Sequence, residues 1–335
     1  MDFKTYLQEH MGRFDDLLLA PYGQSAHQGL ETYLLEPLRA YMGNGGKRFR
    51  PLICLIACEL VGGDPRMAEV TAASLESFHT AALIHDDIAD ESELRRGKPC
   101  LHRTEGVGAA LNMGDYVLLQ VCGSIADDPA LDDALKVRAI HEVSEMMKRT
   151  VEGQALDIGW ARDGVYDLSI EDYLFMADHK TAFYSAAVPL ALGGIVGGGT
   201  EKQVSGLRTF GSEVGLAFQI QDDLLNLIGT EEATRKDFRS DITEGKRTLI
   251  MVHALRHSAD ADELKGILER GTDEADLLER AVRIAYASGS IAYAQEYART
   301  LVEKGKTRLR RSFPDRNDSR ELLLSMADFF IERIS

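Results

Sequence analysis

Apolar residues recur along this chain at spacings of three and four, and strict alternation of apolar and polar residues is scarce. Leu30, Tyr33, Leu34 and Leu38 follow this spacing near the N-terminus. Such a period gathers apolar side chains on one face of a helix. The pattern predicts helices within residues 1–42 and at 51–61, 67–91, 107–126, 131–158, 169–192, 200–228, 264–270, 274–287, 291–309 and 320–334.

The predicted connections are rich in glycine or charge. Gly43, Gly45 and Gly46 interrupt the helical pattern before Lys47, and residues 193–199 hold five glycines, which predict a tight turn between helices. Residues 94–105 are expected to form a polar connection. No repeat or linker divides the chain, so we predict an all-α fold with one domain over residues 1–335.

Composition narrows the class of partner. Hydrophobic residues make up 44% of the chain, and the net charge of −16 argues against a nucleic-acid partner. Lysines and arginines nevertheless cluster beside two acidic motifs, and local charge decides which ligands bind. The four cysteines lack a metal-ligand spacing, and no segment resembles a signal peptide or a membrane span. We therefore expect reduced thiols and a cytoplasmic protein.

Residues 83–97 contain the first candidate site. Asp86 and Asp90 are four residues apart, so a helix places both carboxylates on one face, with Asp87 beside them. Such a pair repels itself unless a cation lies nearby, and hard oxygen ligands suit Mg²⁺. Arg95 and Arg96 supply positive charge for an anion bound to the same metal.

A similar stripe occurs later in the chain. Gln219, Asp222, Asp223 and Asn226 share one face of an otherwise apolar helix. Burying such groups uncompensated is costly, so two stripes that face each other across a helical bundle are most simply explained by metal ions bound between them.

The chain resembles the trans-isoprenyl diphosphate synthases, which make geranylgeranyl and longer polyprenyl diphosphates. Beyond the two acidic motifs, the resemblance rests on Gly45–Pro51, His79, Arg95–Pro99, Lys180–Thr181, Phe218–Gln219, Lys236 and Gly245–Lys246. Two positions depart from the family pattern. Asn226 replaces the aspartate that commonly ends the second motif, and the connection between Gly229 and Lys236 is irregular.

The resemblance implies roles for individual residues and a helical bundle around a central apolar cavity. The metal ligands would be Asp86, Asp90 and Asp222, which would hold three Mg²⁺ ions once diphosphate binds. Catalysis would involve Asp86, Asp87, Asp90, Arg95, Lys180, Asp222 and Asp223. Substrates would contact Lys47, Arg50, His79, Arg95, Arg96, Lys180, Thr181, Gln219, Lys236 and Lys246.

The implied reaction joins isopentenyl diphosphate to dimethylallyl, geranyl or farnesyl diphosphate and releases pyrophosphate. Cavity depth would limit product length. Ala81 and Ala82 are too small to form a floor near Asp86, whereas Phe78 lies eight residues away, roughly 12 Å along a helix. This geometry favours a geranylgeranyl or somewhat longer product. The resemblance also implies a homodimer.

Several alternatives remain open. A class I terpene cyclase shares the first acidic motif but has no need of Lys47, Arg50 and the second acidic motif together. A regulatory subunit of a two-component synthase should have lost acidic ligands, and a helical scaffold would leave the ordered motifs to coincidence. Gln154 and Asp157 share a helix face and either bond locally or line the cavity. His79 is either a core residue or a functional one.

Overall fold

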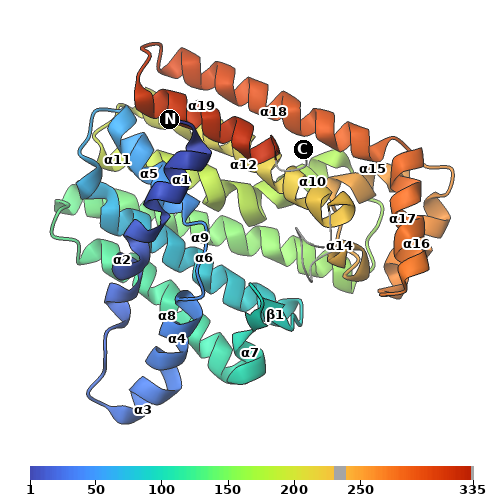
Figure 1. Ribbon diagram of the computed structural model, residues 1–335, viewed down its shortest axis with the longest axis horizontal. Coiled ribbons are helices and arrows are strands. Elements are labelled where there is room, and N and C mark those ends of the chain that lie inside the picture. Colours follow the sequence, from blue (N-terminus) through green and yellow to red (C-terminus); the bar gives the residue numbers. More distant parts are fainter. Residues whose placement is uncertain (230–238, 333–335) are drawn as a thin grey trace. The chain divides into compact units, whose positions relative to one another are not determined.

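The computed structural model of the protein describes residues 1–229 and 239–332. Helices make up most of this part of the chain (Figure 1), which confirms the predicted all-α class. The predicted contact of Lys236 with substrate concerns a residue outside the described ranges. Two compact units are formed, the first by 1–145, 188–207 and 315–323, the second by 146–187, 208–314 and 324–335. The predicted single domain stays a prediction.

The first unit contains most of the N-terminal helices and a small hairpin. Its elements are α1 (Phe3–His10), η1 (Met11–Phe14), α2 (Asp15–Leu19), η2 (Ala20–Tyr22), α3 (Gln28–Leu30), η3 (Glu31–Leu35), α4 (Glu36–Met42), α5 (Phe49–Leu60), η4 (Pro65–Ala68), α6 (Glu69–Ala89), β1 (Leu94–Arg95), β2 (Lys98–Pro99), α7 (Leu101–Thr104), α8 (Val107–Ala126) and α11 (Val188–Val196). Three longer helices contribute residues to both units: α9 (Asp133–Arg162), α12 (Glu201–Ile228) and α19 (Asp318–Ile331).

The second unit contains the remaining helices. They are α10 (Ile170–Ala177), η5 (Asp178–Ala187), α14 (Ser240–Thr243), α15 (Leu249–His257), α16 (Ala261–Arg270), α17 (Ala275–Ala287) and α18 (Ser290–Ser312). Within this unit α15 packs against α10, α16 and α18. Ser169 and Asp172 form a reciprocal capping box at the start of α10, where a helix is predicted to begin.

Close helix packing in the first unit depends on small residues. α8 packs along α6 and α11 packs along α5 (Figure 1). A Cβ atom added at Gly193 would lie 2.0 Å from the backbone oxygen of Cys54. The predicted turn at 193–199 is therefore partly wrong: Gly193 and Gly194 lie inside α11, where they let its backbone approach α5.

Two other expectations need correction. Leu30 and Tyr33 are 51% and 76% exposed, so the apolar stripe predicted near the N-terminus is only partly buried, and Leu38 at its end is the fully buried member. The polar connection at 94–105 contains an antiparallel hairpin in which Leu94 pairs with Pro99 and Arg95 with Lys98. A two-residue strand is too short to give a periodic sequence signal.

Two further expectations concern the state of the cysteines and membrane-spanning segments. Cys54, Cys58, Cys100 and Cys122 are free thiols, and the first three are buried. Among the described residues, no helix is long and apolar enough to cross a membrane.

Candidate active site

The first acidic motif lies at the C-terminal end of α6. The amide of Asp90 donates to the backbone oxygen of Asp86 at 2.8 Å, which closes the last helical turn. This geometry confirms the predicted one-turn spacing of the two carboxylates. The two adjacent aspartates differ in exposure. The side chain of Asp86 is 26% exposed, whereas that of Asp87 is only 1% exposed.

Asp87 is held by donors from two other segments. The Tyr41 hydroxyl, on α4, donates to Asp87 Oδ2 at 3.1 Å. Arg95 Nε, on β1, donates to Asp87 Oδ1 at 2.7 Å, and Arg95 Nη2 lies 2.5 Å from the same oxygen. Arg95 Nη2 is also 4.0 Å from Asp86 Oδ2. The second aspartate of the motif thus fixes an arginine beside the first.

The glycine-rich loop before α5 contacts the hairpin. Gly45 has a φ of 78°, which favours glycine. Its carbonyl accepts a hydrogen bond from the Arg96 guanidinium, and Lys98 donates to the side chain of Asn44. These contacts bring the basic residues that come after the acidic motif to the loop that carries Lys47.

The basic string at 47–50 contains side chains of different kinds. Lys47 is exposed. Arg48 is buried, its Nη1 lies 3.0 Å from Glu76 Oε1, and its Nη2 donates to the Met42 carbonyl. Arg48 directly precedes α5 and adopts the left-handed conformation, with a φ of 47°. Arg48 therefore anchors the loop, which leaves Lys47 and Arg50 as the residues of this string predicted to bind substrate.

His79 lies among arginines. Burial and the positive charges of Arg50, Arg96, Arg95 and Arg48 lower the pKa of His79 well below its usual value. The imidazole is therefore neutral near pH 7. Arg48 and Arg95 are paired with Glu76 and Asp87, so Arg50 and Arg96 are the guanidinium groups that this neutral imidazole leaves for phosphate.

The residues predicted to limit product length follow one another along α6. Phe78 and Ala81 are buried, with 3% and 0% exposure, and Ala82 is partly buried. Their effect on product length stays a prediction.

The second acidic motif lies on α12. Asp222 is exposed, whereas Asp223 is buried at 7% exposure. The Tyr173 hydroxyl, on α10, donates to Asp223 Oδ2 at 2.8 Å, and Gln219 Nε2 donates to Asp223 Oδ1 at 2.8 Å. Gln219, which was predicted to contact substrate, therefore binds an acid of its own motif.

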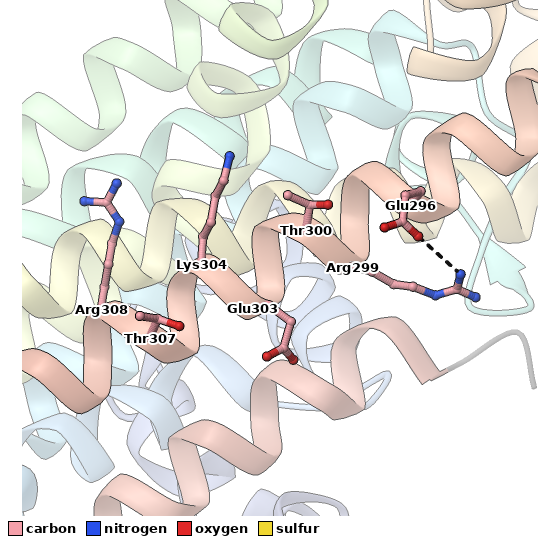
Figure 2. A pocket seen from close by; sticks show the side chains of 7 residues that line it. All are labelled: Glu296, Arg299, Thr300, Glu303, Lys304, Thr307 and Arg308. Carbon is pink, nitrogen blue, oxygen red and sulfur yellow. Dashed lines mark ion pairs between the residues drawn. The ribbon is translucent and has the colours of Figure 1, made fainter.

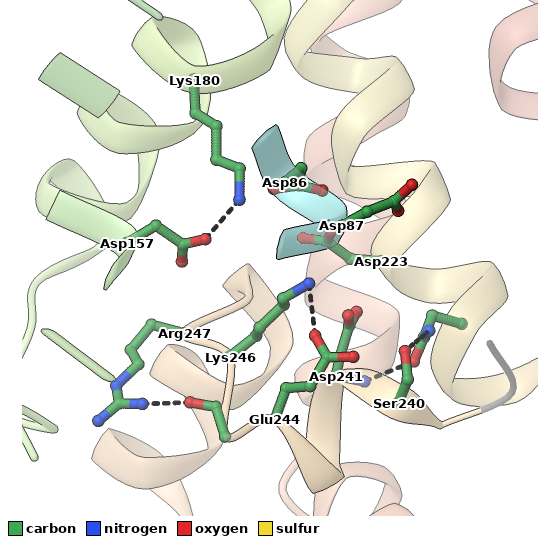
Figure 3. Close-up of polar contacts among 12 residues, drawn as sticks. Asp86, Asp87, Asp157, Lys180, Asp223, Ser240, Asp241, Glu244, Lys246 and Arg247 are labelled. Carbon is green, nitrogen blue, oxygen red and sulfur yellow. Dashed lines mark hydrogen bonds and ion pairs between the residues drawn. The ribbon is translucent and has the colours of Figure 1, made fainter. Parts of the chain in front are cut away.

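Asn226 connects the motif to the segment that begins at Ser240. Its Nδ2 donates to Ser240 Oγ at 3.1 Å, and its Oδ1 accepts from the Asp241 amide at 3.3 Å. Burial raises the pKa of Asp241 to about 7, and the negative charges of Glu244 and Asp222 act in the same direction against the opposing charge of Lys246. Lys246 Nζ itself lies 2.6 Å from Glu244 Oε2 (Figure 3).

Lys180 pairs with an acid on the preceding long helix. Its Nζ lies 2.5 Å from Asp157 Oδ2, and both side chains are largely buried (Figure 3). Lys180 and Thr181 belong to η5, a π-helical segment, and such segments are frequent at functional sites. The structure thus gives Asp157 a partner on another helix, which neither open alternative for Gln154 and Asp157 foresaw.

Arg247 fixes the segment that carries Lys246. It donates to the carbonyls of Val165 and Trp160 at 2.9 Å each and to that of Gly245. Its guanidinium carbon lies 4.1 Å from the centre of the Tyr166 ring. This buried arginine ties the segment to the C-terminal end of α9.

Comparison with known proteins decides the family. The model of the polyprenyl synthetase family matches residues 31–285. The chain belongs to this family. A short chain isoprenyl diphosphate synthase of Methanothermobacter thermautotrophicus is 37% identical over 289 residues, which cover 86% of this chain and 87% of that protein.

Solved structures agree over nearly the whole chain. A geranylgeranyl pyrophosphate synthetase from Pyrococcus horikoshii matches with a TM-score of 0.88 and 31% identity, covering 99% of this chain and 98% of the other. A geranylgeranyl pyrophosphate synthase from Corynebacterium glutamicum, in complex with isoprenyl diphosphate and magnesium, has a TM-score of 0.85 and 28% identity, covering 99% and 98%. As a polyprenyl synthetase, this chain is a prenyltransferase.

The acidic groups of this polyprenyl synthetase suit Mg²⁺, which needs few protein ligands, better than a metal ion whose ligands all come from the protein. Asp86, Asp90 and Asp222 are carboxylates with at least partial exposure. No group of three or more histidine, cysteine, aspartate or glutamate residues in the described ranges could by itself hold a metal ion. Mg²⁺ commonly takes one or two carboxylates and completes its shell with water and phosphate oxygens.

Several residues of this polyprenyl synthetase site were missed in the sequence. Tyr41, Tyr173, Asp241 and Glu244 contact or neighbour the motifs, yet none lies on a motif's own helical stripe. Of these four residues, only Asp241 and Glu244 could have been found from the sequence, because they lie within five residues of Lys246, which was predicted to bind substrate. A separate groove runs along α18 (Figure 2), lined by Glu296, Arg299, Thr300, Glu303, Lys304, Thr307 and Arg308, and contains no predicted residue.

Proposed function

We propose that this polyprenyl synthetase condenses isopentenyl diphosphate with an allylic diphosphate, either dimethylallyl, geranyl or farnesyl diphosphate. The product would be all-trans geranylgeranyl or somewhat longer polyprenyl diphosphate, with pyrophosphate released. The observation that carries the proposal is the end of α6, where Asp86 and Asp90 lie one turn apart and Arg95 Nη2 lies 4.0 Å from Asp86 Oδ2. A diphosphate is the ligand that such a set of charges favours.

The allylic diphosphate is assigned to the acidic motifs. Asp86, Asp90 and Asp222 would hold Mg²⁺, with three ions present once diphosphate is bound. When bound, these ions would neutralise the charge that develops on the departing pyrophosphate, an effect worth several kcal/mol. Arg95, Lys180 and Lys246 would contact the same phosphate oxygens, and Thr181 and Gln219 would line the site.

Isopentenyl diphosphate is assigned to the cationic side chains of the first unit. Lys47, Arg50, His79 and Arg96 would bind its diphosphate and orient its alkene. The carbon–oxygen bond of the allylic diphosphate breaks, and the alkene electrons form the new carbon–carbon bond. A proton then leaves the condensed chain, and the departing pyrophosphate accepts it. No protein side chain is assigned as the base.

The growing chain needs dry surroundings because water would capture the allylic cation. We assign this space to the apolar side of α6, where Phe78 would be the first bulky residue beyond Ala82 and Ala81. We also propose a homodimer, as the family resemblance implies. The cytoplasmic location expected from the sequence stays a prediction.

The test is incubation of purified protein with labelled isopentenyl diphosphate, Mg²⁺ and each allylic diphosphate in turn, followed by analysis of chain length. We expect elongated products only with Mg²⁺ present. Release of pyrophosphate from an allylic substrate without incorporation of label would favour a cyclase. Inactivity with all three primers would favour a regulatory subunit.

A further inference from the structure

The two acidic motifs share a feature that their sequences do not display. In each, the aspartate directly after the first one is buried and accepts a hydrogen bond from a tyrosine. Tyr41 donates to Asp87 at 3.1 Å, and Tyr173 donates to Asp223 at 2.8 Å. Both tyrosines are buried, with 8% and 1% exposure. The same arrangement therefore occurs once in each unit.

The second oxygen of each buried carboxylate is also engaged. Asp87 Oδ1 accepts from Arg95 at 2.7 Å, and Asp223 Oδ1 accepts from Gln219 at 2.8 Å. With a protein donor on each oxygen and little exposure, these carboxylates are suited to fixing their neighbours. The adjacent Asp86 and Asp222, which are more exposed, are suited to metal ions.

Each tyrosine also lies shortly before a lysine assigned to diphosphate binding. Tyr41 precedes Lys47 by six residues, and Tyr173 precedes Lys180 by seven. Each hydroxyl therefore connects a segment that carries such a lysine to the helix that carries the carboxylates. A buried hydrogen bond between a tyrosine hydroxyl and a carboxyl group restrains both segments.

We propose that Tyr41 and Tyr173 are positioning residues, whose hydroxyls hold Asp87 and Asp223 so that, within each unit, the neighbouring carboxylate is arranged for Mg²⁺ and the neighbouring lysine for diphosphate. This inference rests on the proposed function. The tyrosines do not touch the reacting atoms. Their contribution should appear in the binding of Mg²⁺ with pyrophosphate and in the Mg²⁺ concentration that turnover requires.

The test compares Tyr41→Phe and Tyr173→Phe with wild type and with Tyr22→Phe. Tyr22 is a control because it is fully buried and its hydroxyl lies beside Ser77 rather than beside a carboxylate of either motif. Calorimetry measures the binding of inorganic pyrophosphate with Mg²⁺, and a thermal melt of each variant measures folding. We expect each of the two variants to bind about tenfold more weakly, as loss of a buried hydrogen bond predicts, and Tyr22→Phe to match wild type.

A structural role alone would lower the melting temperature of Tyr41→Phe and Tyr173→Phe but leave the affinity of the folded protein unchanged, and that result would overturn the inference. Because the two tyrosines lie in different units, folding of either variant is enough for the comparison. Turnover of wild type with isopentenyl diphosphate is measured alongside. Normal turnover with unchanged affinity in the variants refutes only the positioning role, whereas a wild type that neither elongates nor binds pyrophosphate refutes the proposed function as well.

Discussion

The side chain of Asn226 accepts a hydrogen bond from the backbone amide of Asp241 at 3.3 Å. The residue that ends the second acidic motif therefore fixes the start of the segment that carries Asp241 and Lys246. A neutral amide does this without adding a charge beside Asp222, which lies one helical turn earlier.

Asn226→Asp should make the protein less stable without metal and more responsive to metal. The new carboxylate can still accept from the Asp241 amide but repels Asp222 and Asp241. We expect a lower melting temperature in chelator and a larger increase than wild type on addition of Mg²⁺ and pyrophosphate. The measurement is differential scanning fluorimetry under both conditions. An equal loss of stability in both would mean that the added charge does not meet the metal.

The stability of metal-free protein should depend on Asp241 between about pH 4 and pH 7. The pKa of Asp241 is about 7 in the folded protein, against roughly 4 for an unfolded aspartate. The folded state binds the extra proton in this window, so the contribution of Asp241 to the unfolding free energy falls as pH rises. Urea titrations of wild type and Asp241→Asn should give a flatter pH dependence for the variant. Parallel curves would contradict the raised pKa.

The ion pair of Lys180 and Asp157 allows a double-mutant test. Lys180→Met leaves a largely buried carboxylate without its partner and should reduce the unfolding free energy by about 3 kcal/mol. Adding Asp157→Leu should restore much of the loss, because both charges are then removed. Activity should stay low in the double variant if Lys180 contacts diphosphate. Recovery of activity together with stability would limit Lys180 to a structural role.

Substitutions of the neighbouring residues Arg48 and Lys47 should affect different properties, stability for Arg48 and substrate binding for Lys47. Arg48→Met leaves Glu76, which is 2% exposed, without its partner, and should cost about 3 kcal/mol of unfolding free energy. Lys47 is exposed, so Lys47→Met should change the unfolding free energy by less than about 0.5 kcal/mol. It should instead raise the KM for isopentenyl diphosphate. Urea unfolding and steady-state kinetics of the two variants check both statements, and a loss of stability in Lys47→Met would contradict them.

Two glycines of α9 form a matched pair. A Cβ at Gly153 would lie 2.2 Å from the backbone nitrogen of Lys180, whereas one at Gly159 meets nothing within 4 Å. Gly153→Ala should therefore destabilise the protein by about 1–3 kcal/mol and reduce activity. Gly159→Ala should be neutral or stabilising by roughly 0.5–1 kcal/mol, since alanine favours helix. Thermal melts and turnover of both variants provide the comparison.

The sequence predicted the features that depend on a single helix. The limits of the helix at Val107–Ala126, the one-turn spacing of Asp86 and Asp90 and the end of α12 near Ile228 result from a local period, and the structure confirms them. Contacts between elements were not predictable in this way. A helical period identifies the face that a residue occupies but not the tyrosine or lysine that reaches it from another helix.

Electrostatic partners were the hardest feature to predict. Arg48 has the same charge as its neighbours in the sequence, and only the position of Glu76 makes it a buried anchor. Likewise, Asp157 carried no signal that Lys180 would contact it. Many of the predicted site residues nevertheless take part in the contacts described above. They were selected by their own chemistry, which does not require knowledge of a partner.

The π-helical winding of η5 contains one residue more than α-helical winding of the same segment would need. Hydrogen bonds in a π-helix span five residues and those in an α-helix four. Deleting one residue between Thr181 and Ala187 would allow α-helical winding, and the helix before and after the deletion would keep its relative orientation. In a helix with uniform α-helical winding, the same deletion would turn the two parts by about 100° relative to each other. A one-residue deletion in this segment should therefore disturb the alignment of Lys180 with Asp157 less than the same deletion in an ordinary helix.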